Sequence, residues 1–241
     1  MPLKDLTDSY DRRARLYPMV LVLLPLALGA ASWTPSGIEI PGLVGGAVIV
    51  LAVSTFLTQL ARDQGKRREK ELFRRWGGRP SDRTLSFAAH VFAESTLQRW
   101  HRKLTGLDES LSFPETAEAE KADLKKARAA YAAATDVLVA RTRDQSTFSL
   151  LFKENMNYGF RRNLWGMKPA GIATAAFGMI AAGARCVTFA MNDQQQGVVP
   201  VAAGVLSVIM LVMWIWRVTP AWIRVAADGY AKHLVEACES L

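Results

Sequence analysis

Four long apolar runs constrain this chain more than any other feature of its sequence. They cover 17–33, 40–61, 169–191 and 198–216, and together they hold one charged residue, Arg185. Each run is about 17 to 23 residues long, and a helix needs about 20 apolar residues to cross a hydrocarbon core of about 30 Å. The sequence therefore predicts four transmembrane helices, the first of which would stand nearly upright.

The first run also has features of a cleaved signal peptide. A charged segment precedes it, and the small residues Gly29, Ala30 and Ala31 lie near its end. Pro18 and Pro25, together with the early return of a second apolar run, favour a helical hairpin instead. We expect the first run to be retained as a span.

The distribution of lysine and arginine predicts the orientation of the spans. Segment 62–168 holds 22 of the 30 basic residues, whereas the short connections 34–39 and 192–197 hold none. Cytoplasmic segments of membrane proteins are rich in Lys and Arg, so we expect both connections outside and both termini in the cytoplasm. The sequence thus predicts an all-α integral membrane protein of the bacterial inner membrane, in which two transmembrane hairpins bracket a cytoplasmic helical domain.

The strong basic character of the chain is concentrated in that cytoplasmic domain. Segment 62–168 has 14 acidic residues against its 22 basic ones, a balance of +8 that equals the net charge of the whole chain. Such a surface attracts anionic lipid headgroups, so the bilayer is the expected partner and specific nucleic acid is not. The expected segments are an N-terminal segment 1–16, hairpin 17–61, helical domain 62–168, hairpin 169–217 and tail 218–241.

Three helices are expected within the cytoplasmic domain. The second span should continue to Trp76, with Gly65 a weak point, and end at the glycines and proline of 77–80. Apolar residues at spacings of three and four predict an amphipathic helix over 83–104. A capping-box pattern at 112–115 predicts a further helix to Arg143. Its core seam comprises Leu124, Ala127, Tyr131, Ala134 and Leu138.

No combination of residues in the chain is typical of an enzyme or a metal site. His90, Glu94 and His101 share one helical stripe, but the two histidines would lie about 16 Å apart along an unbroken helix, too far for one ion. We expect His101 on a basic surface or in a polar contact. Cys186 and Cys238 are isolated thiols, and common catalytic and nucleotide-binding motifs are absent from the sequence. The prediction is therefore a protein without enzymatic activity, cofactor or metal.

Arg185 is the one charged residue within the apolar runs. A charge at membrane depth is costly and is a functional candidate by default. It lies about 9 Å along the helix from the expected outer surface, so its side chain can also reach toward Asp193 or Glu39. Two interpretations remain open: an anchor at the membrane surface, or a role in a pore or between helices.

The segment 154–169, ENMNYGFRRNLWGMKP, stands directly before the third apolar run. Arginine and tryptophan are common at a cytoplasmic membrane interface, and this position explains them. The asparagines and the tyrosine are not needed for anchoring, and guanidinium groups beside aromatic rings suit anionic ligands. The expected ligand-binding residues are Asn157, Tyr158, Arg161, Arg162 and Asn163, with Arg74, Arg75 or Arg79 assisting.

Two segments of the chain resemble known proteins. TLQRWHRKL, a helix rich in alanine and glutamate, and NYGFRRNLWGMKP before a span resemble an uncharacterised bacterial four-transmembrane family, for which no functional residues are established. The layout also resembles the four-span effectors of nucleotide-signalled anti-phage defence. That resemblance implies that a nucleotide second messenger or a cytoplasmic protein triggers assembly of a homo-oligomer that permeabilises the membrane.

The leading prediction is accordingly a signal-responsive inner-membrane effector whose spans oligomerise or rearrange. A membrane-anchored scaffold that recruits a cytoplasmic partner is the first alternative. A small channel or transporter is the second, although the spans lack the paired acidic residues and broken helices that are typical of ion-coupled transport.

Overall fold

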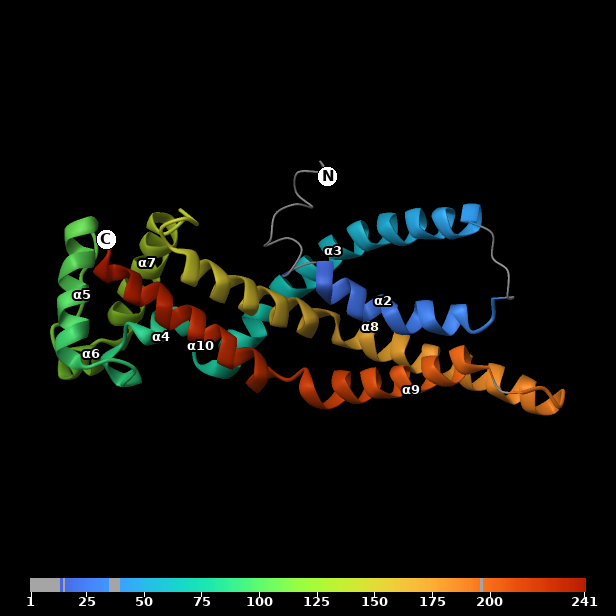
Figure 1. Ribbon diagram of the computed structural model, residues 1–241. Coiled ribbons are helices and arrows are strands. Elements are labelled where there is room, and N and C mark those ends of the chain that lie inside the picture. Colours follow the sequence, from blue (N-terminus) through green and yellow to red (C-terminus); the bar gives the residue numbers. More distant parts are fainter. Residues whose placement is uncertain (1–13, 15, 35–39, 196) are drawn as a thin grey trace. The chain divides into compact units, whose positions relative to one another are not determined.

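A computed structural model describes residues 14, 16–34, 40–195 and 197–241, with the backbone alone described for 40–57 (Figure 1). Every regular element in these residues is a helix, and none of them forms a strand. The all-α prediction is confirmed for this part of the chain. Nearly all of the expected N-terminal segment 1–16, and the first outer connection with Glu39, lie outside the described residues.

The helices differ widely in length. In chain order they are α2 (Tyr17–Ala31), α3 (Ile40–Trp76), α4 (Pro80–Thr84), η2 (Phe87–Ala89), α5 (Glu94–Leu107), α6 (Ala117–Ala122), α7 (Leu124–Arg141), α8 (Ser149–Met191), α9 (Val198–Val212), the π-helical turn η3 (Met213–Arg217), α10 (Pro220–Glu236) and η4 (Ala237–Glu239).

The chain divides into two compact units. Unit 1 comprises Met1–Glu69 and Gly159–Ile223, and unit 2 comprises Lys70–Tyr158 and Arg224–Leu241. The chain passes from one unit to the other inside α3, α8 and α10, not in a loop.

In the part of the chain that the structure describes, two helical segments are long and apolar enough to cross a membrane. They are Ser149–Met191 and Val198–Arg217, whereas α2 is apolar but shorter, at 15 residues. On α9 the side chains of Val198, Val205 and Ile209 are more than half exposed. Apolar helices with exposed apolar side chains support membrane association. The four-span topology stays a prediction.

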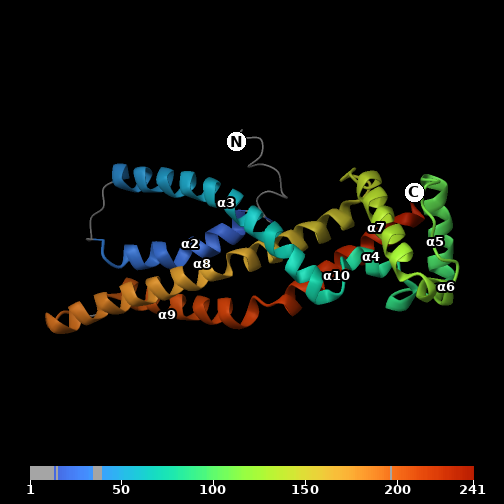
Figure 2. The same ribbon diagram turned by 180° about the vertical axis from the view of Figure 1, so that it is seen from behind.

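Close contacts at glycines hold the helices of unit 1 together. A Cβ on Gly178 of α8 would lie 2.4 Å from the Pro25 carbonyl oxygen of α2, and one on Gly166 would lie 2.6 Å from the Gly65 nitrogen of α3. Gly65 therefore marks a close approach within an unbroken helix. The two views agree in placing α2 beside α8 (Figures 1 and 2). Small residues allow this proximity.

The C-terminal end of α9 is held by a lysine of α8. The helix widens into η3, where the Val218 N–H donates to the Met213 carbonyl at 3.3 Å. The last carbonyls of a helix lack N–H partners from the helix itself. Lys168 supplies donors, because its Nζ donates to the Ile215 oxygen at 3.0 Å and the Val218 oxygen at 2.9 Å.

The core of unit 2 is formed by α5, α7 and the C-terminal half of α10 with neighbouring turns. Four of the five predicted seam residues of α7 are almost fully buried, but Leu124 is 47 % exposed. The buried core residues are Leu85, Phe87, Leu97, Trp100, Leu104, Leu111, Ala127, Tyr131, Ala134, Leu138, Leu151, Leu234, Val235 and Cys238.

The end of α3 matches the sequence prediction. Gly78 N–H donates to the Phe73 carbonyl at 2.8 Å and Gly77 N–H to the Arg74 carbonyl at 3.4 Å, the pattern of a Schellman cap. Gly77 has φ +78° and Gly78 φ +135°, conformations that residues with a Cβ rarely adopt. Pro80 then begins α4 after this turn.

The continuous helix predicted over 83–104 is wrong. The segment forms the end of α4, the single turn η2 and then α5, which starts at Glu94. Ser86 caps η2 by accepting from the Ala88 N–H, and His90 has φ +50°, in the left-handed region. A helix cannot pass through such a residue. The amphipathic pattern predicted from the apolar spacing is confirmed for α5, where Leu97, Trp100 and Leu104 are buried.

The single helix predicted from 112–115 to Arg143 is also wrong. Thr116 caps α6 by accepting from the Ala119 N–H at 3.2 Å, and Asp123 caps α7 by accepting from the Lys126 N–H at 2.9 Å. An N-cap side chain favours a helix start because it satisfies an orphan backbone donor. These caps divide the segment into two helices.

Candidate ligand-binding site

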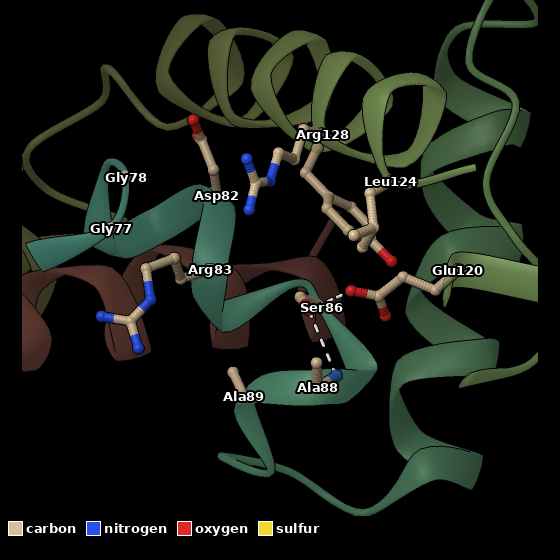
Figure 3. Close-up of a pocket in the computed structure, with 11 residues that line it drawn as sticks. Gly77, Gly78, Asp82, Arg83, Ser86, Ala88, Ala89, Glu120, Leu124 and Arg128 are labelled. Atoms are coloured by element: carbon tan, nitrogen blue, oxygen red, sulfur yellow. Dashed lines mark hydrogen bonds between the residues drawn. The ribbon is translucent and has the colours of Figure 1, made fainter. Parts of the chain in front are cut away.

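A pocket of about 280 Å³ lies in unit 2, on one side of α7. The α4–η2 segment forms one wall, and Glu120 of α6 with the first half of α7 forms the other (Figure 3). We call it the α4–α7 pocket. Its lining residues are Gly77, Gly78, Asp82, Arg83, Ser86, Ala88, Ala89, Glu120, Leu124, Arg128 and Tyr131.

Glu120 is a buried carboxylate in the wall of this pocket. Its side chain is 4 % exposed, and it accepts hydrogen bonds from the Phe87 N–H at 2.8 Å and from the Ser86 hydroxyl. Glu120 comes from α6, whereas both donors come from the turn at η2. The same carboxylate therefore stabilises the turn that separates α4 from α5, and it places a negative charge beside the pocket.

Tyr131 brings a buried hydroxyl to the same pocket. The residue is 2 % exposed, and its hydroxyl lies close to the carboxylate of Glu120. Burial, then the negative charge of Glu120 and the contact with its carboxylate, raise the pKa of Tyr131 above its ordinary value. A neutral hydroxyl that faces a carboxylate can still accept a hydrogen bond from a bound molecule.

Two arginines line the same pocket as the carboxylate. Arg128 is exposed on α7 and has no ion pair or hydrogen bond within the described part of the chain. Arg83 donates to the Trp76 carbonyl at 2.8 Å and extends away from Glu120 (Figure 3). The pocket thus combines a buried carboxylate, a tyrosine hydroxyl beside it and an unpaired cation, which is a chemistry for binding a small polar molecule.

Asp82 and Arg79 form an ion pair beside this pocket. Arg79 Nε donates to the Asp82 carboxylate at 2.8 Å, and its Nη atoms donate to the Asp136 carboxylate at 2.9 Å and the Ala132 carbonyl at 3.0 Å. Arg79, one of the predicted assisting cations, therefore joins α4 to α7. Of the other two, Arg75 pairs with Glu71, and Arg74 is exposed.

The predicted ligand-binding residues all lie on α8. In unit 1, Arg161 donates to the Trp222 carbonyl at 2.8 Å with its guanidinium 4.8 Å from the centre of the Trp222 ring. Arg162 pairs with Glu69 at 3.0 Å. Asn163 is 1 % exposed, and its amide donates to the Ala14 carbonyl at 2.7 Å. These side chains already have partners within the chain.

The other two predicted residues belong to unit 2. Tyr158 is buried and stacks on Tyr230 of α10 with ring centres 6.3 Å apart. Asn157 is half-buried on α8.

Arg185 lies against aromatic rings within unit 1. Its guanidinium carbon is 5.4 Å from the ring centre of Trp33 and 4.4 Å from that of Phe189. Trp33 follows α2, and its indole N–H donates to the Ala181 carbonyl of α8 at 2.9 Å. A cation over aromatic faces is stabilised by the ring quadrupole. The arginine thus contributes to a contact between the end of α2 and α8.

The predicted histidine stripe does not form on one helix. His90 ends η2 and Glu94 begins α5, so the helical spacing does not hold across the segment. No group of three metal-ligating side chains occurs among the described residues. His101 was expected on a basic surface or in a polar contact, and the second alternative is confirmed. The residue is buried, and its Nε2 contacts the Leu85 carbonyl at 2.9 Å.

Sequence reasoning missed the residues that make the α4–α7 pocket. Glu120 belongs to an alanine- and glutamate-rich stretch, a composition that is typical of a solvated helix face. The spacing of Tyr131 predicts a core residue. The Ser86 cap was the available signal, because a serine before a short apolar turn can start a new helix. Comparison of the chain with protein-family models, with curated proteins and with solved structures finds no match.

Proposed function

We propose that this protein is a ligand-responsive effector of the bacterial inner membrane. Its four apolar segments would cross the bilayer as two hairpins, with both termini in the cytoplasm. Unit 2 would bind a small signal molecule in the α4–α7 pocket. The apolar helices would respond by rearranging or by forming a homo-oligomer that permeabilises the membrane, as in anti-phage defence. A nucleotide second messenger or a cytoplasmic protein is the signal that the resemblance implies.

The observation that carries this proposal is the chemistry of the α4–α7 pocket. Buried Glu120 and Tyr131 and unpaired Arg128 provide a binding site within unit 2, whereas the apolar segment Val198–Arg217 belongs to unit 1. The chain joins the units inside continuous helices. A ligand that favours one arrangement of a helix in unit 2 can therefore bias the same helix in unit 1. Exposed apolar side chains on α9 further support lipid contact or assembly.

We place the ligand in this pocket and not at Arg161, Arg162 and Asn163. Those side chains bind partners in their own unit, so a ligand there would have to displace existing contacts. In the proposal they hold α8 in place, and Arg161 with Trp222 faces anionic headgroups of the bilayer.

Cysteine labelling tests the topology. In intact cells that lack the native cysteines, a membrane-impermeant maleimide should label Asp193→Cys in the expected outer connection. Asp228→Cys in α10 should be labelled after permeabilisation alone. Labelling of Asp228→Cys in intact cells, or recovery of the protein in the soluble fraction, would overturn the membrane proposal.

Release of carboxyfluorescein from vesicles of phosphatidylethanolamine and phosphatidylglycerol tests the effector activity. Vesicles that contain the purified protein should retain the dye until a molecule from a panel of nucleotides and amino acids is added. Vesicles that contain the Arg128→Gln variant should retain the dye after the addition as well. Solute flux without any addition would favour the transporter alternative. A protein that inserts but never releases dye would favour the scaffold.

A further inference from the structure

The α4–α7 pocket contains two opposite charges without partners of opposite sign. Glu120 is almost fully buried, and both of its hydrogen bonds come from neutral donors, a hydroxyl and a backbone amide. Arg128 has no carboxylate partner among the residues that the structure describes. A buried carboxylate without a counter-charge is costly. A ligand that brings a positive group to Glu120 would remove this cost.

The remaining charges of the pocket are already engaged. Asp82 pairs with Arg79 at 2.8 Å, and Arg83 donates to the Trp76 carbonyl. These contacts leave Glu120 and Arg128 as the charges that a ligand can complement. The two residues come from different helices, α6 and α7, and line the same pocket (Figure 3).

The hydroxyl of Tyr131 adds a third group of matching chemistry. It is buried, it lines the pocket close to the Glu120 carboxylate, and its oxygen accepts no hydrogen bond from the described residues. An ammonium group has three N–H donors, which the Glu120 carboxylate and the Tyr131 oxygen can accept. A guanidinium such as that of Arg128 binds a carboxylate or a phosphate through two parallel hydrogen bonds. The pocket therefore offers one end for a cation and another for an anion.

The volume of the pocket limits the size of the molecule. The volume of about 280 Å³ is slightly below the range of about 300–1,000 Å³ that is typical of pockets for drug-sized ligands. We propose that the α4–α7 pocket binds a small dipolar metabolite, an amino acid or an amino phosphate, with its ammonium group on Glu120 and Tyr131 and its anionic group on Arg128. This inference rests on the proposed function only in taking this pocket as the ligand site.

Calorimetric titration and thermal unfolding of the full-length protein in detergent test the inference. The probes are the twenty common amino acids, β-alanine, γ-aminobutyrate and phosphoethanolamine. At least one should bind and raise the melting temperature. Its analogues that lack the amino group or the anionic group should bind at least about tenfold more weakly, since each loses one charge-assisted contact. Absence of binding by every probe, or equal binding of the analogues, overturns the inference.

Variants assign the two ends of the bound molecule. Glu120→Gln and Arg128→Gln should each weaken binding at least about tenfold, whereas Lys125→Gln, on an exposed position of α7 outside the pocket lining, should leave it unchanged. Arg128 is exposed, so its variant tests the inference even if Glu120→Gln impairs folding. Unchanged binding by Arg128→Gln overturns the inference. Binding without dye release from vesicles contradicts the effector proposal alone, and dye release triggered by nucleotides without dipolar-ligand binding contradicts this inference alone.

Discussion

Trp100 donates its indole N–H to the carboxylate of Glu239 at 2.7 Å, joining α5 to the last turn of the chain. Arg99 pairs with the same carboxylate, and Lys103 Nζ donates to the carbonyls of Cys238 at 3.0 Å and Glu239 at 3.1 Å. These residues belong to the stretch TLQRWHRKL that stood out in the sequence. Within unit 2 these contacts hold η4 against α5, and Cys238 of η4 is buried in the core.

Trp100→Phe should destabilise unit 2 by about 1–3 kcal/mol, because the variant loses the hydrogen bond to Glu239 and also leaves a cavity where the smaller ring of the buried indole was. Denaturant unfolding followed by circular dichroism measures the change. Arg102→Gln, an exposed change on the same helix, is the matched control and should leave the unfolding midpoint unchanged. A Trp100→Phe midpoint equal to that of the control would show that the contact with Glu239 contributes no stability.

The burial of His101 should make stability depend on pH. Its Nε2 contacts the Leu85 carbonyl, Phe113 stacks on its ring at 4.3 Å, and burial lowers the pKa of His101 from 6.5 to about 4. The unfolded chain therefore takes up a proton at higher pH than the folded chain. The free energy of unfolding should therefore be highest above pH 6.5, where His101 is neutral in both states. It should fall by up to about 3 kcal/mol as the pH is lowered toward about 4.

Unfolding between pH 7 and pH 4 checks this dependence. His101→Gln can keep a donor for the Leu85 carbonyl but has no imidazole to protonate, so its stability should fall less steeply with pH than that of the wild type. His90→Gln changes an exposed histidine and should keep the wild-type profile. Parallel profiles for wild type and His101→Gln would exclude His101 as the titrating group.

Gly171→Ala should destabilise unit 1 by about 1–3 kcal/mol through overpacking. An added Cβ would lie 2.2 Å from the Trp214 ring, and Trp214 is fully buried. Gly183→Ala on the same helix meets nothing within 4 Å and should be neutral or stabilising. Unfolding by SDS in mixed micelles compares the two variants. A similar response from both would contradict the close packing of α8 against Trp214.

The contact of Arg185 with Trp33 should appear as a coupling energy. In a double-mutant cycle of Arg185→Gln and Trp33→Leu, we expect a coupling of about 0.5–2 kcal/mol, the range of cation–π pairs. Mixed-micelle unfolding measures it. Additive effects, together with loss of dye release in Arg185→Gln, would favour the pore interpretation of this residue over a contact between helix ends.

The sequence predicted the elements whose signals are local. The apolar runs predict helices, Gly77 and Gly78 end α3 as expected, and the seam of α7 is largely buried. Each of these signals depends on residues within a few turns of one another, so periodicity and turn chemistry suffice to read them.

Tertiary contacts decided the break near His90 and the α4–α7 pocket. The apolar spacing of 83–104 favours one helix, but Glu120, 33 residues beyond Phe87, accepts the Phe87 N–H and stabilises the turn instead. The same contact holds Glu120 in the pocket that Tyr131 and Arg128 also line, which no spacing in the sequence indicates. The sequence by itself determined a helical chain with long apolar segments. The tertiary structure decided where the helices break and which charged residues line one pocket. The reason is that every buried backbone N–H needs an acceptor. In an unbroken helix the Phe87 N–H would bond to a carbonyl of the preceding turn, but in the folded protein it donates to the distant carboxylate of Glu120.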